Sequence, residues 1–84
     1  MKLCFHPLAW DDYLHWQKAD PKRLSRINEL LRAIKRDPFR GIGKPEPLRG
    51  NWAGFWSRRI DREHRLVYAL EDGSILIAQC RYHY

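Results

Sequence analysis

The side chains best suited to chemistry in this chain are a glutamate, a histidine, several arginines and a terminal tyrosine. They are Glu46, Arg49, Arg59, Arg65, His83 and Tyr84. Cleavage of an RNA phosphodiester needs a base for the 2′-OH, an acid for the leaving 5′ oxygen, and cations for the charge of the pentacovalent phosphorane. An aromatic ring can stack on a base and hold the 2′-OH in line with the bond that breaks. These residue types therefore suit RNA cleavage without a metal ion or any other cofactor.

Glu46 is the candidate base because of its neighbours, Pro45 and Pro47. Proline fixes its own φ and restricts the residue before it, so the carboxylate is expected to be held in place. The alternative is an ordinary solvated glutamate in an irregular segment. Loop glutamates, strand arginines and terminal histidines occur in many basic domains, so these residues alone leave both interpretations open.

The elements that must position these side chains begin with three segments rich in β-branched and aromatic residues. They cover residues 55–60, 64–70 and 75–84. Short polar turns separate them, and this pattern predicts an antiparallel meander. The second turn, Asp72-Gly73, is a strong hairpin signal because both central residues of such a turn must accept positive φ.

The meander predicts where its charged residues lie. Arg59 and Arg65 flank the corner at residues 61–63 and should lie close to one end of the sheet. Arg81 and His83 are expected to extend the third strand to the end of the chain. A sheet that carries arginine and histidine at its strand ends is suited to binding an anion.

A strand and two helices are predicted before the meander, over residues 2–6, over 8–18, and from Pro21 to the Asp37-Pro38 pair. Pro7 and Pro21 suit first helical turns, and Asp20 can cap the second helix. The first helix carries an aromatic and apolar stripe that is expected in the core, and the second carries an apolar seam. The stripe is Trp10, Tyr13, Leu14 and Gln17, and the seam is Leu24, Ile27, Leu31 and Ile34.

The predicted fold class is therefore α+β, in a single domain that spans residues 1–84. A strand and two helices precede an antiparallel meander of three to four strands. The irregular segment between helices and meander holds Glu46, and Leu48 with Arg49 are candidates for a further short strand. The helices should cover one face of the sheet and leave the other partly concave and basic.

The composition of the chain indicates which classes of binding partner and which compartment to expect. The formal net charge of +6 favours a polyanion, either a nucleic acid or an acidic protein segment. No apolar stretch is long enough to span a bilayer and no signal peptide is recognisable, which predicts a cytoplasmic protein without a membrane partner. Cys4 and Cys80 are expected to be small buried hydrophobic residues rather than a disulfide.

The sequence closely resembles the YoeB toxins (the Txe/YoeB family) of the RelE-like toxin superfamily, over essentially the whole chain. Each motif alone is modest, but the combination is specific. The motifs are Trp10-Asp11-Asp12-Tyr13-Leu14 with Trp16-Gln17, Gly43-Lys44-Pro45-Glu46-Pro47-Leu48, Gly54-Phe55-Trp56-Ser57-Arg58-Arg59-Ile60, Glu63-His64-Arg65-Leu66-Val67-Tyr68, and Cys80-Arg81-Tyr82-His83-Tyr84.

This resemblance implies the RelE-like microbial ribonuclease architecture and the toxin of a type II toxin–antitoxin system. It implies a ribosome-dependent mRNA interferase, an endoribonuclease that cuts mRNA in the A site of the 70S ribosome and so inhibits translation. It also implies a cognate YefM-like antitoxin as inhibitor and a tendency to form a homodimer.

The resemblance also implies roles for single residues. Glu46 corresponds to the general base and His83 to the general acid, while Arg65 stabilises the phosphate and Tyr84 is the C-terminal aromatic residue needed for activity. The residues expected to bind the substrate are Arg59, Arg49 and Lys44.

The competing hypothesis is a non-catalytic basic module that binds RNA or acts as a co-repressor through its antitoxin. Glu46 would then be a solvated loop residue, and His83 with Tyr84 a packed tail. A toxin directed at DNA topoisomerase is a third possibility, but it would not need the set of Glu46, Arg65 and His83.

Overall fold

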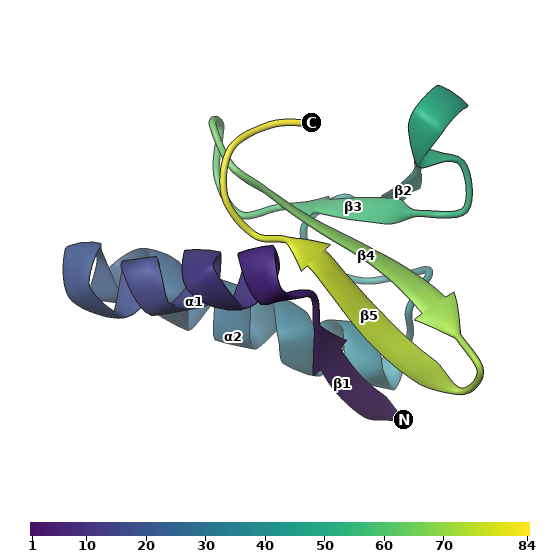
Figure 1. Ribbon diagram of the computed structural model, residues 1–84, viewed down its shortest axis with the longest axis horizontal. Coiled ribbons are helices and arrows are strands. Elements are labelled where there is room, and N and C mark those ends of the chain that lie inside the picture. The colour runs from purple at the N-terminus through teal and green to yellow at the C-terminus, as the bar shows by residue number, and fades with distance from the viewer.

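The computed structural model describes residues 1–84 as two helices that cover one face of a five-stranded sheet (Figure 1). The elements are β1 (Lys2–Phe5), α1 (Pro7–Ala19), α2 (Pro21–Arg36), β2 (Glu46–Pro47), the 3₁₀ helix η1 (Gly50–Trp52), β3 (Trp56–Arg59), β4 (Arg65–Glu71) and β5 (Ser74–Gln79). The strand order is β1-β5-β4-β3-β2, with β1 parallel to β5 and every other pair antiparallel. The predicted α+β class and the four-stranded meander are confirmed.

Both helices begin at the residues that the sequence predicts. His6 caps α1, since its Nδ1 accepts a hydrogen bond from the Leu8 amide at 3.2 Å. Asp20 caps α2 through Oδ1, which accepts from the amides of Lys22 and Arg23. A proline follows each cap and needs no hydrogen-bond partner there. Neither helix is long and apolar enough to cross a membrane.

The core lies between the helices and the sheet. Its members come from α1, α2, β4, β5 and the residues that directly follow β3 and β5; they are Ala9, Trp16, Ile27, Leu30, Leu31, Ile34, Ile60, Leu66, Tyr68, Ile75, Ile77 and Cys80. The seam predicted on α2 is confirmed at Ile27, Leu31 and Ile34, while Leu24 packs at its edge. Leu30 also belongs to the core.

The prediction for the buried face of α1 is wrong, because the helix turns a different set of side chains toward the core. Trp10 is 46% exposed and Leu14 38% exposed, whereas Ala9 and Trp16 are buried. The indole Nε1 of Trp16 donates to the buried carbonyl of Cys80 at 2.9 Å. This bond ties α1 to the end of β5, and Trp10 is left to stack on Tyr13 at 5.6 Å near the surface.

The third meander strand is shorter than predicted. β5 ends at Gln79, and residues 80–84 leave the sheet as a tail that arches over the face opposite the helices (Figure 1). Tyr82 adopts a left-handed backbone conformation with φ of 65°, which departs from the extended conformation of a regular strand. The short strand suggested at Leu48 lies instead at Glu46–Pro47, on the sheet edge, where a proline removes no needed hydrogen bond.

The two cysteines differ from each other. Cys80 is fully buried, as predicted, and its pKa is raised to about 12 by burial, with a further contribution from Asp12. Cys4 is exposed, which contradicts the prediction, because it points away from the core that Leu3 and Phe5 contact on the same strand. Both are free thiols.

A fully buried arginine, Arg58, organises the loop between α2 and β2. Its Nε donates to the Tyr68 hydroxyl at 3.1 Å, and its guanidinium donates to the carbonyls of Asp37, Arg40 and Ile42 at 2.7, 2.9 and 3.1 Å. The charge is therefore satisfied by neutral acceptors, and the loop is wrapped around it.

The core reaches the surface beside this loop. The rings of Phe39 and Trp56 meet with their centroids 5.0 Å apart, and Phe39 is 49% exposed.

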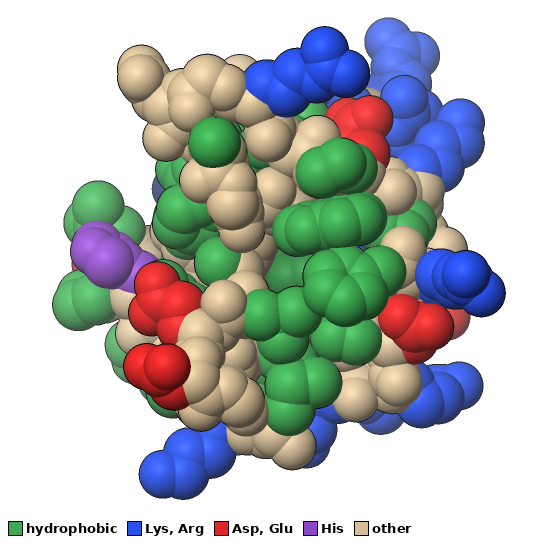
Figure 2. Space-filling view, turned by 90° about the vertical axis from the view of Figure 1, so that its right-hand side faces the viewer, with side chains coloured by type: hydrophobic (Ala, Val, Ile, Leu, Met, Phe, Trp, Pro, Cys, Tyr) green, Lys and Arg blue, Asp and Glu red, His purple; other side chains and the backbone are tan.

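On the side of the molecule that holds the β4–β5 turn, hydrophobic side chains gather at the centre of the face and lysine and arginine side chains extend at its rim (Figure 2). On this face the basic charge is thus carried on projecting side chains.

Candidate active site

The candidate active site lies on the sheet face opposite the helices. Glu46 of β2 pairs with Ser57 of β3, which pairs with Val67 of β4, so all three side chains share one face. Trp56 and Tyr68 point to the helical side, where both contact the core. The edge strand therefore turns Glu46 toward the face over which the C-terminal tail arches.

The tail brings Tyr84 to Glu46. The Tyr84 hydroxyl donates to Glu46 Oε1 at 3.1 Å and lies 3.3 Å from the Ser57 hydroxyl. Glu46 is exposed and Tyr84 is 40% exposed, so both are accessible from solvent. Two of the predicted site residues, 38 positions apart in sequence, thus meet directly.

His83 lies beside Tyr84 but makes no hydrogen bond to Glu46. Its ring centroid is 4.8 Å from that of Tyr84, and its Nδ1 is 3.3 Å from the Tyr84 carbonyl oxygen. It also lines a groove between the tail, η1 and the start of α1, with Trp52 and Phe55 among the lining residues. Tyr84 therefore contacts both candidate proton-transfer groups, through its hydroxyl on one side and its backbone on the other.

Arg59 and Arg65 face each other across β3 and β4. The Nη1 of Arg65 donates to the carbonyls of Asp61, His64 and Arg62 at 2.7, 3.1 and 3.3 Å, which folds the guanidinium over the corner. Neither arginine forms a salt bridge with a carboxylate. Like charges directly opposite are unfavourable in a sheet, so this pair is suited to binding an anion.

Arg49 and Lys44 lie at the margin of the site. Arg49 precedes η1 and is exposed, with no side-chain hydrogen bond at the cap. Lys44 is exposed in a turn with φ of 52°, and the preceding Gly43 carbonyl accepts from the Arg59 amide at 2.7 Å. The structure places neither side chain in contact with Glu46 or Tyr84. No group of three His, Cys, Asp or Glu side chains could hold a metal ion.

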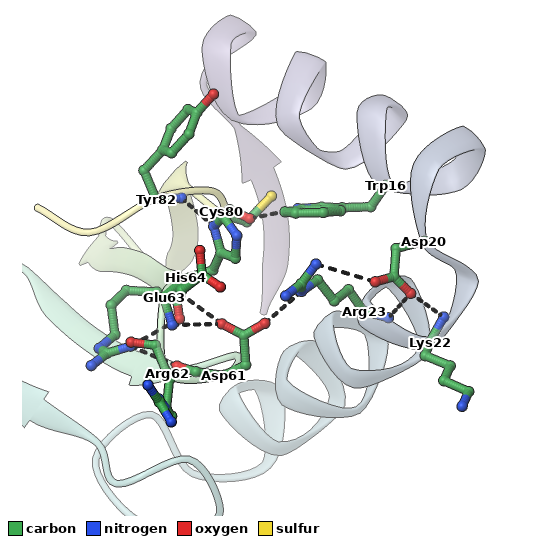
Figure 3. Close-up of polar contacts among 11 residues, drawn as sticks. Trp16, Asp20, Lys22, Arg23, Asp61, Arg62, Glu63, His64, Cys80 and Tyr82 are labelled. Carbon is green, nitrogen blue, oxygen red and sulfur yellow. Dashed lines mark hydrogen bonds and ion pairs between the residues drawn. The ribbon is translucent and has the colours of Figure 1, made fainter.

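The corner between β3 and β4 is held by a hydrogen-bonded aspartate (Figure 3). Asp61 Oδ1 accepts from the amides of Glu63 and His64, each at 2.8 Å, and Asp61 Oδ2 pairs with Arg23 of α2. Burial opposes ionisation of Asp61, but the hydrogen bond from Arg23 and those from the two amides outweigh it, so its pKa is lowered. The corner that orients Arg65 is thereby anchored to α2.

His64 is the residue near the site that sequence reasoning missed. It is buried, and its Nδ1 accepts from the Tyr82 amide at 2.7 Å (Figure 3). A histidine between Glu63 and Arg65 gives no sign of burial in the sequence. Only its position within one of the segments that resemble the YoeB toxins pointed to it.

Asp12 of α1 supports the start of the tail, since its Oδ2 accepts from the Cys80 amide at 3.1 Å. Its pKa is raised chiefly by burial, against the lowering effects of that bond and of Arg81. The folded pKa of Asp12 is therefore higher than the unfolded pKa of 3.8. Ionisation of Asp12 then lowers the free energy of unfolding of the wild-type protein as the pH rises from 3.8 through the folded pKa. We expect Asp12→Asn, which keeps an acceptor oxygen, to gain free energy of unfolding relative to wild type over this rise.

Urea unfolding of wild type, Asp12→Asn and Asp12→Ala at a series of acidic to neutral pH values measures this effect. Asp12→Ala serves as the control, because it removes the acceptor for the Cys80 amide at every pH. A difference between wild type and Asp12→Asn that stays constant with pH, or that moves in favour of wild type, would contradict the assignment.

The two-layer fold is the one seen in the RelE-like toxins. A family model described as the YoeB-like toxin of bacterial type II toxin–antitoxin systems matches residues 5–84. Toxin YoeB of Escherichia coli K12 is 60% identical over 84 residues, with all of both chains covered. The chain belongs to the YoeB toxin family.

Solved structures agree with this membership. The YoeB/ParE toxin from Agrobacterium tumefaciens superposes with a TM-score of 0.96 and 51% identity over all of both chains. YoeB of Staphylococcus aureus, solved in complex with YefM, gives 0.91 at 48% identity, and its dimer gives 0.92 at 49%. Both superpositions cover all of this chain and 98% of the other.

Proposed function

We propose that this chain is a ribosome-dependent mRNA interferase: a toxin that enters the ribosomal A site, cuts the mRNA there and so inhibits translation. The contact of Tyr84 with Glu46, beside the Arg59–Arg65 pair, carries this proposal. It gathers a base, an aromatic platform and two cations on one open face. Family membership supports a toxin of a type II toxin–antitoxin system, whose natural compartment would be the cytoplasm.

In the proposed reaction Glu46 takes the proton from the 2′-OH, and the 2′ oxygen forms a new bond to phosphorus. The bond from phosphorus to the 5′ oxygen breaks, and His83 donates its proton to that leaving oxygen. Arg65 and Arg59 stabilise the charge of the phosphorane. The products are a 2′,3′-cyclic phosphate and a 5′-hydroxyl, so every proton and electron pair is accounted for without a cofactor.

Tyr84 regulates access to the base in this scheme. Its hydroxyl occupies Glu46 Oε1 in the free protein, and Glu46 must exchange this bond for the substrate 2′-OH. The ring then stacks on a base and holds the nucleotide in line. The face is open rather than enclosed, which fits a substrate whose geometry is set by the ribosome.

Blocking the nucleophile tests this chemistry. Ribosomes programmed with an mRNA that carries a single 2′-deoxynucleotide at the cut position should resist cleavage, while the all-ribose message is cut to cyclic phosphate and 5′-hydroxyl ends. Equal cleavage of both messages would rule out attack by the 2′-OH.

The Tyr84 side chain allows a graded prediction. Tyr84→Phe keeps the ring and loses the hydroxyl bonds to Glu46 and Ser57, so cleavage should stay close to wild type. Deleting Tyr84 removes the ring. Because stacking is worth roughly 1–3 kcal/mol per base, deletion should lower the rate by about one to two decades.

Single-turnover cleavage on programmed ribosomes compares the three proteins, with thermal unfolding as the control for folding. Equal rates would mean that the tail serves only packing. A loss in Tyr84→Phe as large as that of the deletion would assign the role to the hydroxyl instead of the ring.

The YoeB–YefM complexes and the dimer of the Staphylococcus aureus relative support a YefM-like antitoxin and a homodimer as partners of this chain too. We propose that an Asp- and Glu-rich antitoxin segment lies along the basic surface of α2 or the concave sheet face. Three arginines that line a groove at the end of α2, Arg32, Arg36 and Arg40, have no carboxylate partner within the chain.

Complementary charge mainly speeds association, so the on-rate for antitoxin should fall steeply from low to physiological salt. The double variant Arg32→Gln/Arg36→Gln should lower this salt dependence. Lys2→Gln/Lys18→Gln removes the same charge elsewhere and should lower it less. Stopped-flow or surface-based kinetics at several salt concentrations measure the rates, and an on-rate indifferent to salt would instead indicate a chiefly apolar interface.

A further inference from the structure

Tyr82 is the residue at which the tail changes direction. Its φ of 65° is left-handed, a conformation that a bulky non-glycine residue adopts only when its surroundings enforce it. After it come His83 and Tyr84; the two contact each other, and Tyr84 also contacts Glu46 and Ser57. The conformation of Tyr82 therefore determines where the two terminal side chains lie.

Both backbone groups of Tyr82 are fixed. Its amide donates to His64 Nδ1 at 2.7 Å, and its carbonyl accepts from the Arg65 amide at 2.9 Å. Tyr82 is 58% exposed, and its ring lies against the Arg81 guanidinium and the His64 ring near the surface, so burial of the ring does not impose the left-handed turn. The two short hydrogen bonds to adjacent residues, His64 at the corner and Arg65 at the start of β4, impose it instead; a longer bond of 3.5 Å from Gln79 Nε2 also reaches the carbonyl.

The tail is also tied just before this turn. Cys80 is held by Trp16 and Asp12, and the Arg81 carbonyl accepts from Gln79 Nε2 at 2.9 Å. These contacts secure the chain up to Arg81. At Tyr82 itself, Gln79 Nε2 reaches the carbonyl oxygen at 3.5 Å but does not bind the amide. Among the side chains that anchor the tail, His64 is the one bound to Tyr82 at its amide.

His64 is itself rigidly placed. Its amide donates to Asp61 at 2.8 Å, and its ring meets Trp16 edge-on with centroids 4.9 Å apart. Because the Tyr82 amide is a donor, Nδ1 must be unprotonated, which leaves the neutral ring with its proton on Nε2. The buried Nδ1 of His64 is therefore held in the orientation that accepts the hydrogen bond of the Tyr82 amide.

We propose that His64 is a positioning residue for mRNA cleavage: its Nδ1 holds Tyr82 in the left-handed turn that directs His83 and Tyr84 toward Glu46. This inference rests on the proposed nuclease function. His64 does not touch the substrate in this scheme and acts only through the tail. Loss of the acceptor misplaces groups at the reacting atoms, where a shift of an ångström can cost about a hundredfold in rate.

The test compares His64→Ala with His64→Asn, whose amide oxygen can take the place of Nδ1. On programmed ribosomes, His64→Ala should lower the cleavage rate at saturation by up to about a hundredfold with little change in KM, and His64→Asn should restore most of it. Thermal unfolding sets a temperature at which both variants are folded. Wild-type cleavage by His64→Ala, or a folded His64→Asn as slow as His64→Ala, overturns the inference.

If neither variant folds, two measurements on the wild-type protein test whether His64 Nδ1 accepts from the Tyr82 amide. They are the nitrogen chemical shifts of the His64 ring and the hydrogen exchange of the Tyr82 amide. The expected result is the Nε2-protonated tautomer and a protected amide. An Nδ1-protonated ring or an unprotected amide overturns the inference. Absence of cleavage by wild type would instead overturn the proposed function, whatever the state of His64.

Discussion

Glu46→Gln and His83→Ala are each expected to lower mRNA cleavage on programmed ribosomes by about 10²- to 10⁴-fold, the usual contribution of a positioned acid or base. Both side chains are exposed, and substitutions at such positions usually change the free energy of unfolding by about 0.5 kcal/mol or less. Glu46→Gln keeps the size of the side chain and an oxygen for the Tyr84 hydroxyl. A loss of activity without a loss of stability would therefore reflect proton transfer.

Glu71→Gln is a matched control, because it makes the same change at an exposed carboxylate at the far end of β4. It should cleave at the wild-type rate. Either Glu46→Gln or His83→Ala with wild-type activity would refute the acid–base assignment, and loss of activity in Glu71→Gln would point to a general effect of charge.

Arg58→Met should lower the free energy of unfolding by roughly 3–5 kcal/mol, because it leaves buried acceptors without their donor. Arg58 is fully buried and donates to three backbone carbonyls and the Tyr68 hydroxyl. Each unsatisfied buried acceptor costs about 1–3 kcal/mol, while methionine recovers some of the packing. The loop that leads to Glu46 would lose its central contact.

The neighbouring Arg59→Met is the control, since Arg59 is exposed on the opposite face of the same strand. Its unfolding in urea should match that of wild type, although the proposed function predicts slower cleavage. Arg58→Met within about 1 kcal/mol of wild type would contradict the structural role assigned to this arginine.

These two arginines show where sequence reasoning reaches its limit. The alternation of a strand predicts that Arg58 and Arg59 point to opposite faces, but not which of them is buried. The buried position became favourable only because the carbonyls of the α2–β2 loop converge on it, a tertiary arrangement that no local pattern encodes. Arg59 was predicted for the site and lies opposite Arg65, as the corner implied.

The parts of the fold specified by local chemistry were predictable. The start of α1 follows from Pro7 and that of α2 from Asp20 and Pro21, and the hairpin follows from Asp72-Gly73, whose φ values are 48° and 75°. The parallel pairing of β1 with β5 was not predicted, because it joins opposite ends of the chain. The same reason applies to residues 80–84, whose path is set by side chains of α1 and of the corner.

For the site, the sequence supplied the residue types and the structure supplied the contacts. Glu46 was singled out by its flanking prolines, and its pairing with Ser57 on an edge strand explains its orientation. The bond between Tyr84 and Glu46 follows the turn at Tyr82, where His64 binds the amide, and no role was predicted for His64 from its residue type. The roles of all these residues stay predictions, and Arg49 and Lys44 in addition form no side-chain hydrogen bond or salt bridge with the other site residues.

Primer extension on one message, with its start codon intact or mutated, tests the central claim most directly. Cleavage on the ribosome predicts protein-dependent cuts in the translated message, at a fixed position relative to the reading frame, and none in the untranslated one. A non-catalytic RNA-binding or co-repressor module would give no cuts in either message. Cuts that are equal in both, without regard to frame, would contradict dependence on the ribosome.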